Sequence, residues 1–294
     1  MHRCDISCLR PRTRSLRMVK GVVSHQTPSP GSAWRSGTVA IAQGRLAYHR
    51  TGVNARPLVL AHGLTDNGLC WSRVATALAA SFDIIMLDAR GHGQSSRISD
   101  GDDHDPGRDI AEAIGKLELN NVILMGHSVG ARAAATCAGL IPDSISRLIL
   151  EDPPLLPLGD EATREKRLLA LREQVAAFQA MSDAEIATKG KASSPLWHED
   201  EFPAWSASKK QFDPAAYPRY TQTWQQTLSH ICAPTLLIYG EAARGSLVTP
   251  AIANEATTLN PHLRTIQISG AGHNVRRENF SDYLAAVQEF LADS

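Results

Sequence analysis

NVILMGHSVGA, residues 121–131, decides the fold, because it joins a short apolar, β-branched run to the alanine-rich stretch at 132–140. A strand buried on both faces reads as such a run, bounded here by turn residues and a helical segment. Gly126 and Gly130 flank Ser128 in the pattern G-x-S-x-G, whose tight turn raises a serine hydroxyl above the end of a strand. The stretch therefore predicts a strand, a sharp turn at Ser128 and a helix.

The same design recurs along the chain. Apolar runs that end in turn residues are PLVLAHG at 57–63, DIIMLDARGHG at 83–93, RLILEDPP at 147–154, PTLLIYG at 234–240 and RTIQIS at 264–269. A hairpin is expected before them, from TVAIAQ at 38–43 to RLAYHRTG at 45–52. Because parallel strands need a crossover that is usually a helix, this alternation predicts a mostly parallel α/β sheet with helices on both faces.

Three regions differ in composition. Residues 155–232 hold no β-branched run and read as helices, so we expect a helical cap inserted into a catalytic core of residues 38–154 and 233–294. Residues 1–37 are rich in arginine, proline and serine, a composition that cannot bury a core. We expect them to be a disordered or extraneous N-terminal extension; an organelle transit peptide and a nucleic-acid arm are alternatives.

Charge and cysteine usage narrow the class of protein. Thirty basic and thirty acidic residues give zero formal net charge, so neither nucleic acid nor an anionic membrane is an expected partner. Five cysteines without CxxC spacing favour a reduced compartment, and the absence of an apolar span or signal segment is consistent with a cytoplasmic protein. No H-E-x-x-H pair occurs, and we expect the acidic cluster at 197–201 to be solvated, so no metal or cofactor is expected. Oligomeric state is not readable.

Ser128 needs a base, because a serine hydroxyl is too weakly acidic to attack a carbonyl unaided. His273 is the candidate: it lies in GAGHN at 270–274, after the last expected strand, at the edge of the sheet where ligands bind in α/β folds. His62, His92 and His127 belong to glycine-flanked turns. We expect these histidines to stabilise their turns through packing and hydrogen bonds.

Attack on a carbonyl creates an oxyanion, which preorganised N–H groups must stabilise. We expect one N–H from Val129, which follows the nucleophile at the start of a helix. The other is expected from Leu64, which follows His62-Gly63 at the end of a strand.

Four motifs in this order resemble the α/β-hydrolase superfamily: HG at 62–63, DARGHGQS at 88–95, GHSVG at 126–130 and GAGH at 270–273. The resemblance covers residues 38–294. It implies an α/β-hydrolase fold with an eight-stranded sheet, a cap after the sixth strand, and a chain order of nucleophile, acid and histidine that Ser128 and His273 respect.

The acid departs from the commonest pattern of the superfamily. Most members resemble one another in placing an aspartate just beyond strand seven, where this chain reads GEAAR at 240–244. A rarer arrangement places it after strand six, where Glu151 and Asp152 stand. Side chains alternate along a strand, so only one of these two should face His273, and Asp152 is nearer the loop. We predict Asp152 as the acid, with Glu151 and Glu241 as the alternatives.

The resemblance implies an esterase or lactonase acting on a small, relatively apolar carboxylic ester through an acyl-enzyme on Ser128. Carbon–carbon bond hydrolases and cofactor-free haloperoxidases of this fold also use serine and remain alternatives, whereas haloalkane dehalogenases and epoxide hydrolases would carry aspartate at this position. A hydrolase-like small-molecule receptor is the alternative of another class. The cap residues expected to line the substrate pocket, or else the cap's own core, are Trp197, Trp205 and Trp224.

Overall fold

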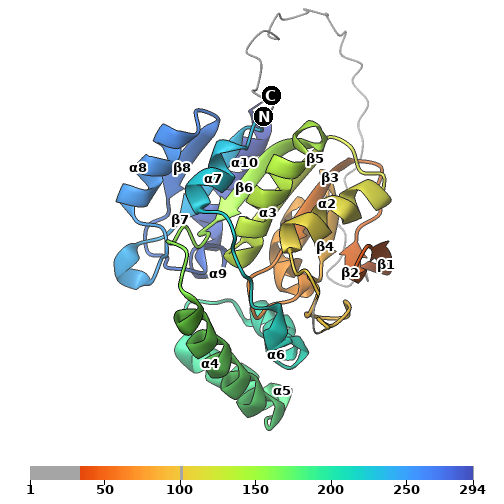
Figure 1. Cartoon of the computed structure of the whole chain (residues 1–294), viewed down its shortest axis with the longest axis vertical. Coiled ribbons are helices and arrows are strands. Elements are labelled where there is room, and N and C mark those ends of the chain that lie inside the picture. The colour runs from red at the N-terminus through yellow and green to blue at the C-terminus, as the bar shows by residue number, and fades with distance from the viewer. Residues whose placement is uncertain (1–33, 100–101, 294) are drawn as a thin grey trace, which may run out of the picture. The chain divides into compact units, whose positions relative to one another are not determined.

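A computed structural model describes residues 34–99 and 102–293 of the chain. Eight strands form one sheet in the order β1-β2-β4-β3-β5-β6-β7-β8, with β1, β2 and β4 antiparallel and the other neighbours parallel (Figure 1). This confirms the predicted mostly parallel, eight-stranded sheet. The strands are β1 (Arg35–Ile41), β2 (Gly44–Arg50), β3 (Arg56–Ala61), β4 (Phe82–Leu87), β5 (Val122–His127), β6 (Ile145–Glu151), β7 (Thr235–Tyr239) and β8 (Leu263–Gln267).

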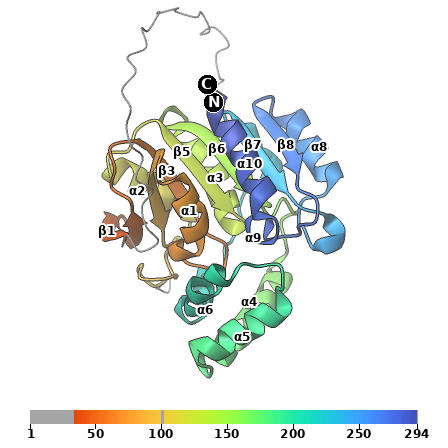
Figure 2. The ribbon, with the colours of Figure 1, turned by 180° about the vertical axis from the view of Figure 1, so that it is seen from behind.

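Helices cover both faces of the sheet, as Figures 1 and 2 show from opposite sides. One face packs against α2 (Pro106–Lys116), α3 (Val129–Leu140), α7 (Trp224–Ser229) and α8 (Pro250–Leu259). The other packs against α1 (Ser72–Leu78), α9 (Val275–Glu278) and α10 (Phe280–Ala292). Every residue of β5 and β7 is buried, which is why these strands are almost wholly apolar. In the described part of the chain, no helix is both long and apolar enough to span a membrane.

The segment after β6 forms helices, as expected. They are α4 (Glu161–Gln179), α5 (Asp183–Ser193) and α6 (Phe202–Gln211), which Figure 1 shows together beyond one end of the strands. Asp160 caps α4 by accepting from the Thr163 N–H at 2.7 Å, and Ser182 begins α5 in a capping box. We call α4 to α6 the cap. The last helix of the expected cap segment, α7, instead packs against α3 and α8.

The first strand begins earlier than the composition suggests. β1 starts at Arg35, inside the segment assigned to an extension, and pairs residue by residue with β2 as far as Arg50. Antiparallel pairing uses backbone groups and needs no apolar run. Gly37 lies opposite Tyr48, and a side chain there would begin 2.5 Å from the tyrosine ring. Residues 1–33 of the expected extension lie outside the described residues.

Candidate active site

Ser128 stands at the tight turn between β5 and α3. Its φ of 54° and ψ of −124° lie in a region that L-residues rarely adopt, a strain typical of functional turns. Both flanking glycines are required: a Cβ on Gly126 would lie 2.4 Å from the Gly130 carbonyl oxygen, and one on Gly130 would lie 2.3 Å from that of His62. The predicted strand, turn and helix thus occur with the geometry that projects a serine hydroxyl.

Three side chains predicted to act together are hydrogen-bonded in series. The Ser128 Oγ lies 3.0 Å from His273 Nε2, and His273 Nδ1 lies 2.6 Å from Asp152 Oδ2. Because a carboxylate can only accept, Nδ1 carries the hydrogen and Nε2 is left to receive the serine proton. Asp152 is fully buried, whereas the His273 side chain is 29% exposed. The arrangement can remove a proton from Ser128 and stabilise the imidazolium that results.

Asp152 is held by the loop that follows β7. It accepts from the Ser246 hydroxyl at 2.6 Å, from the Leu247 N–H at 2.9 Å and from the Val248 N–H at 3.0 Å. With His273 these bonds occupy all the acceptor sites of the carboxylate. Sequence reasoning missed Ser246, because a serine in a loop carries no signal. The loop that would hold the commonest acid therefore orients the acid from β6.

The two alternative acids have other partners. Glu151 is fully buried and accepts from the Arg276 N–H at 2.9 Å and from its Nη1 at 3.0 Å. Glu241 accepts from the Gly270 N–H at 2.9 Å and the Ser269 hydroxyl at 2.8 Å. Neither carboxylate contacts the His273 ring. Asp152 lies just beyond the end of β6 with a φ of 41°, so the side-chain alternation expected for a strand does not extend to it.

The two N–H groups expected to bind an oxyanion lie beside Ser128. A Cβ on Gly63 would lie 3.6 Å from the Ser128 Cβ, so the loop that carries Leu64 runs alongside the nucleophile. Val129 is the first residue of α3, where the helix leaves its N–H unpaired. Within the described ranges neither the Leu64 nor the Val129 N–H has a hydrogen-bond acceptor. Both remain available to a ligand.

The turn histidines hold these loops in place. His127 Nε2 lies 3.1 Å from the His273 carbonyl oxygen. His62 Nδ1 bonds the Gly63 carbonyl at 2.8 Å while its Nε2 accepts from the Ala89 N–H, and His92 Nε2 contacts the Leu64 carbonyl. Burial lowers the pKa of His62 and His127, so both are neutral near pH 7.

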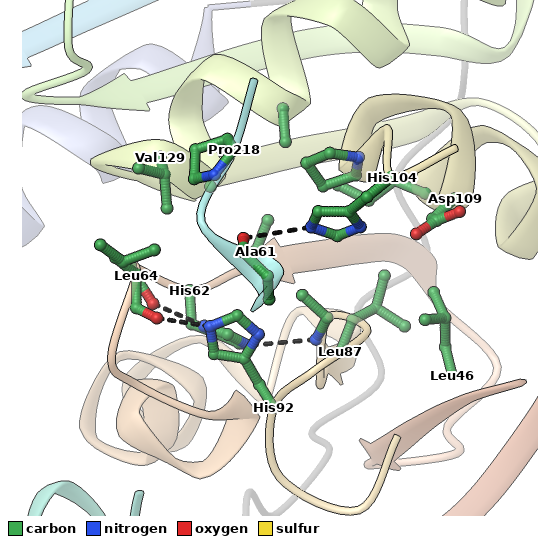
Figure 3. A pocket seen from close by; sticks show the side chains of 17 residues that line it. Leu46, Ala61, His62, Leu64, Leu87, His92, His104, Asp109, Val129 and Pro218 are labelled. Atoms are coloured by element: carbon green, nitrogen blue, oxygen red, sulfur yellow. Dashed lines mark hydrogen bonds between the residues drawn. The ribbon is translucent and has the colours of Figure 1, made fainter. Parts of the chain in front are cut away.

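An apolar cavity of about 40 Å³ opens beside the expected oxyanion groups (Figure 3). Gly63, Leu64 and Val129 form one end of its wall, and Leu46, Leu87 and Ile110 are among the apolar side chains further in. We call it the inner cavity. Its volume suits a short apolar group rather than a long chain.

Trp197, Trp205 and Trp224 are not among the residues that line the inner cavity, and the packing of Trp197 and Trp205 follows the second of the two expected roles. Trp224 is 4% exposed and lies in the core between the sheet and its helices. Trp197 stacks on Phe202, and its ring centre is 5.8 Å from that of Trp205, which in turn covers Gly190. Aromatic rings in a small helical layer are used first for the layer's own packing.

A buried cluster of six charged residues joins the cap to both catalytic loops. Asp66, two residues after Leu64, binds Lys209 of α6 at 3.1 Å and Arg277 of α9 at 3.0 Å. The remaining pairs are Arg276 with Glu151 at 3.0 Å, Arg276 with Asp66 at 3.5 Å, and Arg277 with Glu201 at 3.1 Å. We call these residues the ionic cluster. Sequence reasoning missed it because its members come from four distant segments.

Charge complementarity keeps Asp66, at the centre of the ionic cluster, ionised. Burial alone would raise the pKa of Asp66, but the charges of Arg277, Lys209 and Arg276 outweigh burial and hold this pKa well below its usual value. Three cations face three carboxylates, so the cluster is neutral overall. Over residues 34–99 and 102–293, no group of three His, Cys, Asp or Glu side chains is placed to hold a metal ion.

Buried histidines make stability depend on pH. Burial lowers the pKa of His104 to about 4, so the folded protein holds this ring neutral while the unfolded chain binds a proton near pH 6.5. The free energy of unfolding should therefore fall as the pH drops from 6.5 towards 4, with His104 contributing a loss of about 2 kcal/mol at pH 5. Urea titrations at pH 7.5 and 5.0 measure this loss, and His104→Gln should reduce it by about that amount.

Asp109 acts in the opposite direction. Burial raises its pKa to about 6, so it favours the folded state more as the pH falls through 6. The effects of His104 and Asp109 on the free energy of unfolding can be separated, because His104→Gln removes the contribution of the histidine and leaves that of Asp109. An equal loss of stability between pH 7.5 and 5.0 in the variant and the wild type would contradict the assignment to His104.

Comparison with known proteins agrees with this geometry. A family model described as alpha/beta hydrolase fold matches residues 56–276. The chain is 29% identical to N-formylmaleamate deformylase of Pseudomonas putida, in a match that covers 84% of this chain and 92% of that relative. It is 24% identical to Esterase YbfF of Escherichia coli, over 82% of this chain and 94% of that relative. The crystal structure of E-2-(acetamidomethylene)succinate hydrolase superposes with a TM-score of 0.68 at 23% identity, over 88% of this chain and 99% of that one. The chain belongs to the α/β-hydrolase family, and it is a hydrolase.

Proposed function

We propose that the protein hydrolyses a small carboxylic ester or lactone, apolar next to the reacting carbonyl, through an acyl-enzyme on Ser128. The series of hydrogen bonds from Ser128 through His273 to Asp152 carries this proposal. The inner cavity beside the expected oxyanion groups supports it, because an acyl or alcohol group of a few carbons fits there.

In the proposed reaction His273 Nε2 takes the Ser128 proton as Oγ attacks the substrate carbonyl. Asp152 holds the Nδ1 hydrogen of His273 and stabilises the positive ring, and the N–H groups of Leu64 and Val129 stabilise the oxyanion. His273 then passes its proton to the leaving alcohol, and the acyl group stays on Ser128. Water activated by the same histidine releases the acid and restores the enzyme.

The relatives' names support hydrolysis and widen the choice of bond. One is called an esterase, and another is a deformylase named for an N-formyl compound. The same series of side chains can attack an amide carbonyl, so an N-formyl substrate is the second candidate for this chain.

Pre-steady-state kinetics with 4-nitrophenyl esters of increasing acyl length test the proposal. We expect a burst of 4-nitrophenol equal to the enzyme concentration, largest in rate for short acyl groups, and covalent labelling of Ser128 by a fluorophosphonate. Ser128→Ala, folded to the same extent, should show neither. Lactones, an N-formyl amide and a carbon–carbon substrate complete the panel.

Each alternative predicts a different pattern. A receptor would show neither burst nor turnover while still binding ligands. A carbon–carbon hydrolase would turn over only its own substrate class, and a haloperoxidase would need peroxide and halide. Absence of Ser128 labelling in a folded protein would overturn the proposed mechanism.

A further inference from the structure

Arg132 is a buried cation without a buried anion. It lies on α3, four residues after Ser128, and is only 2% exposed. Its Nη2 donates to the Gln222 carbonyl at 2.8 Å, and its guanidinium carbon lies 4.8 Å from the centre of the Tyr220 ring. Its Nε has no acceptor, and within the described ranges no carboxylate lies within 4.0 Å of it. The other arginines buried to this degree, Arg90, Arg276 and Arg277, each bind a carboxylate.

An isolated buried charge is expensive, and arginine cannot escape the cost by losing its proton. Burial lowers the pKa of Arg132, and Tyr220 only partly opposes that effect. A guanidinium is also the side chain best shaped to bind a carboxylate through two parallel hydrogen bonds. The described protein residues therefore leave the Arg132 guanidinium without a counterion.

Arg132 lines a second cavity, of about 420 Å³, between α2, α3 and residues 218–222. We call it the outer cavity. Tyr220 also lines it, and its buried hydroxyl has no hydrogen-bond partner among the described residues. Two residues that border the outer cavity thus each carry a polar group without a partner, the Arg132 guanidinium at its Nε and Tyr220 at its hydroxyl.

The other charged residues of the outer cavity already have partners. Arg108 binds Asp103 at 2.9 Å, Asp105 caps α2, and Arg219 binds Glu161. Among the described charged residues of this cavity, Arg132 is the one left without a charged partner, and a ligand carboxylate would supply it. A single carboxylate matches one unpaired guanidinium better than a doubly charged phosphate does.

The outer cavity adjoins the active site. Four residues line both cavities, namely His104, Pro106, Ala133 and Pro218. Figure 3 shows His104 and Pro218 in the inner cavity. The inner cavity in turn begins at Leu64 and Val129, where the carbonyl is expected to bind. A substrate carbonyl at Ser128 and an anion at Arg132 can therefore belong to one molecule.

We propose that Arg132, with the Tyr220 hydroxyl, binds a carboxylate at the far end of the substrate's acyl chain. The substrate is then an ester of a dicarboxylic acid, apolar beside the reacting carbonyl and anionic at its other end. This rests on the proposed function and narrows its substrate class. Arg132 selects the substrate and takes no part in the bond changes at Ser128.

Two esters with the same acyl length test the proposal, 4-nitrophenyl hydrogen adipate and 4-nitrophenyl hexanoate. The wild type should prefer the adipate. Arg132→Gln should lower kcat/KM for the adipate by roughly 10- to 100-fold, mainly through KM, the size expected for a charge-assisted hydrogen-bond pair. It should change kcat/KM for the hexanoate by less than about twofold.

Matched variants distinguish a loss of carboxylate binding from a general loss of activity. Arg264→Gln removes a cation of β8 that is already paired and lines neither cavity, and should leave both esters unaffected. Arg132→Lys keeps the charge without the planar fork and should fall between wild type and Arg132→Gln for the adipate alone. Tyr220→Phe should lower kcat/KM for the adipate several-fold and leave the hexanoate unchanged.

Calorimetry supplies a readout besides activity. Ser128→Ala should bind free adipate, and Ser128→Ala/Arg132→Gln should lose that binding. Adipate should also inhibit hexanoate hydrolysis competitively in the wild type, whereas binding without competition would place the anion outside the substrate and overturn the proposal. Equal effects of Arg132→Gln or Arg132→Lys on the two esters would overturn it as well. Failure of the proposed function looks different, since neither ester would then produce a burst.

Discussion

Asp152→Asn should lower kcat for ester hydrolysis by about 10⁴-fold in the protein that remains folded, with KM nearly unchanged. It should also lower stability, because the amide NH2 would face the N–H of Leu247 or Val248. The amide keeps the shape of the carboxylate but can no longer both hold the Nδ1 hydrogen of His273 and balance the positive ring. An amide nitrogen facing Nδ1 would move the hydrogen to Nε2, where it blocks removal of the Ser128 proton. Burst kinetics with a short 4-nitrophenyl ester measure the effect on acylation directly.

The matched variants are Glu241→Gln and Glu151→Gln. Glu241 bonds Ser269 and Gly270 rather than the His273 ring, so its amide should keep most of kcat. Glu151→Gln unbalances Arg276 and should lower stability, yet the folded fraction should still acylate. If Asp152→Asn kept most of kcat while Glu241→Gln lost it, the acid would be assigned wrongly.

Asp66→Asn should lower the free energy of unfolding by about 3–5 kcal/mol, the usual result of removing one partner from a buried ion cluster. Asp66 is 5% exposed and is the only carboxylate among the described residues that pairs with Lys209. Without it, three buried cations face two carboxylates. Urea unfolding at pH 7.5 measures the loss.

A double variant shows whether the loss comes from unpaired charge. Lys209→Met removes the cation that Asp66→Asn leaves without a carboxylate, so the double variant should lose less stability than the two single losses added together. Thr65 also accepts from Lys209, at 2.8 Å through its hydroxyl, and this bond is lost in the same variant. If Asp66→Asn lowered the free energy of unfolding by less than about 1 kcal/mol, water would be solvating the charges that the variant leaves unpaired.

The ionic cluster also bears on catalysis through position. Asp66 follows the expected oxyanion residue Leu64 by two positions, and Arg276 follows His273 by three. Because the cluster ties both loops to Lys209 in the cap, Asp66→Asn should lower kcat in the protein that remains folded, without abolishing it.

What the sequence by itself determined is local. The tight turn at Ser128 needs two glycines within two residues, and the strand before it and the helix after it have different apolar patterns. The histidine loop at 270–274 could be placed in the same way, because the end of the last strand is marked by glycine. The fold follows from repeats of this local design, since alternating strands and helices have few ways to cover both faces of a sheet.

Only the tertiary structure decided which distant side chains meet. The choice between Asp152 and Glu241 depended on where the loop at 246–248 aims its donors, and no residue near either carboxylate shows this in the sequence. Likewise, sequence alone cannot tell that Arg277 has carboxylate partners 76 and 211 positions away while Arg132 has none among the described residues. A buried charge is paired or unpaired according to contacts made across the core, and those contacts are set by sheet order, helix packing and the position of the cap.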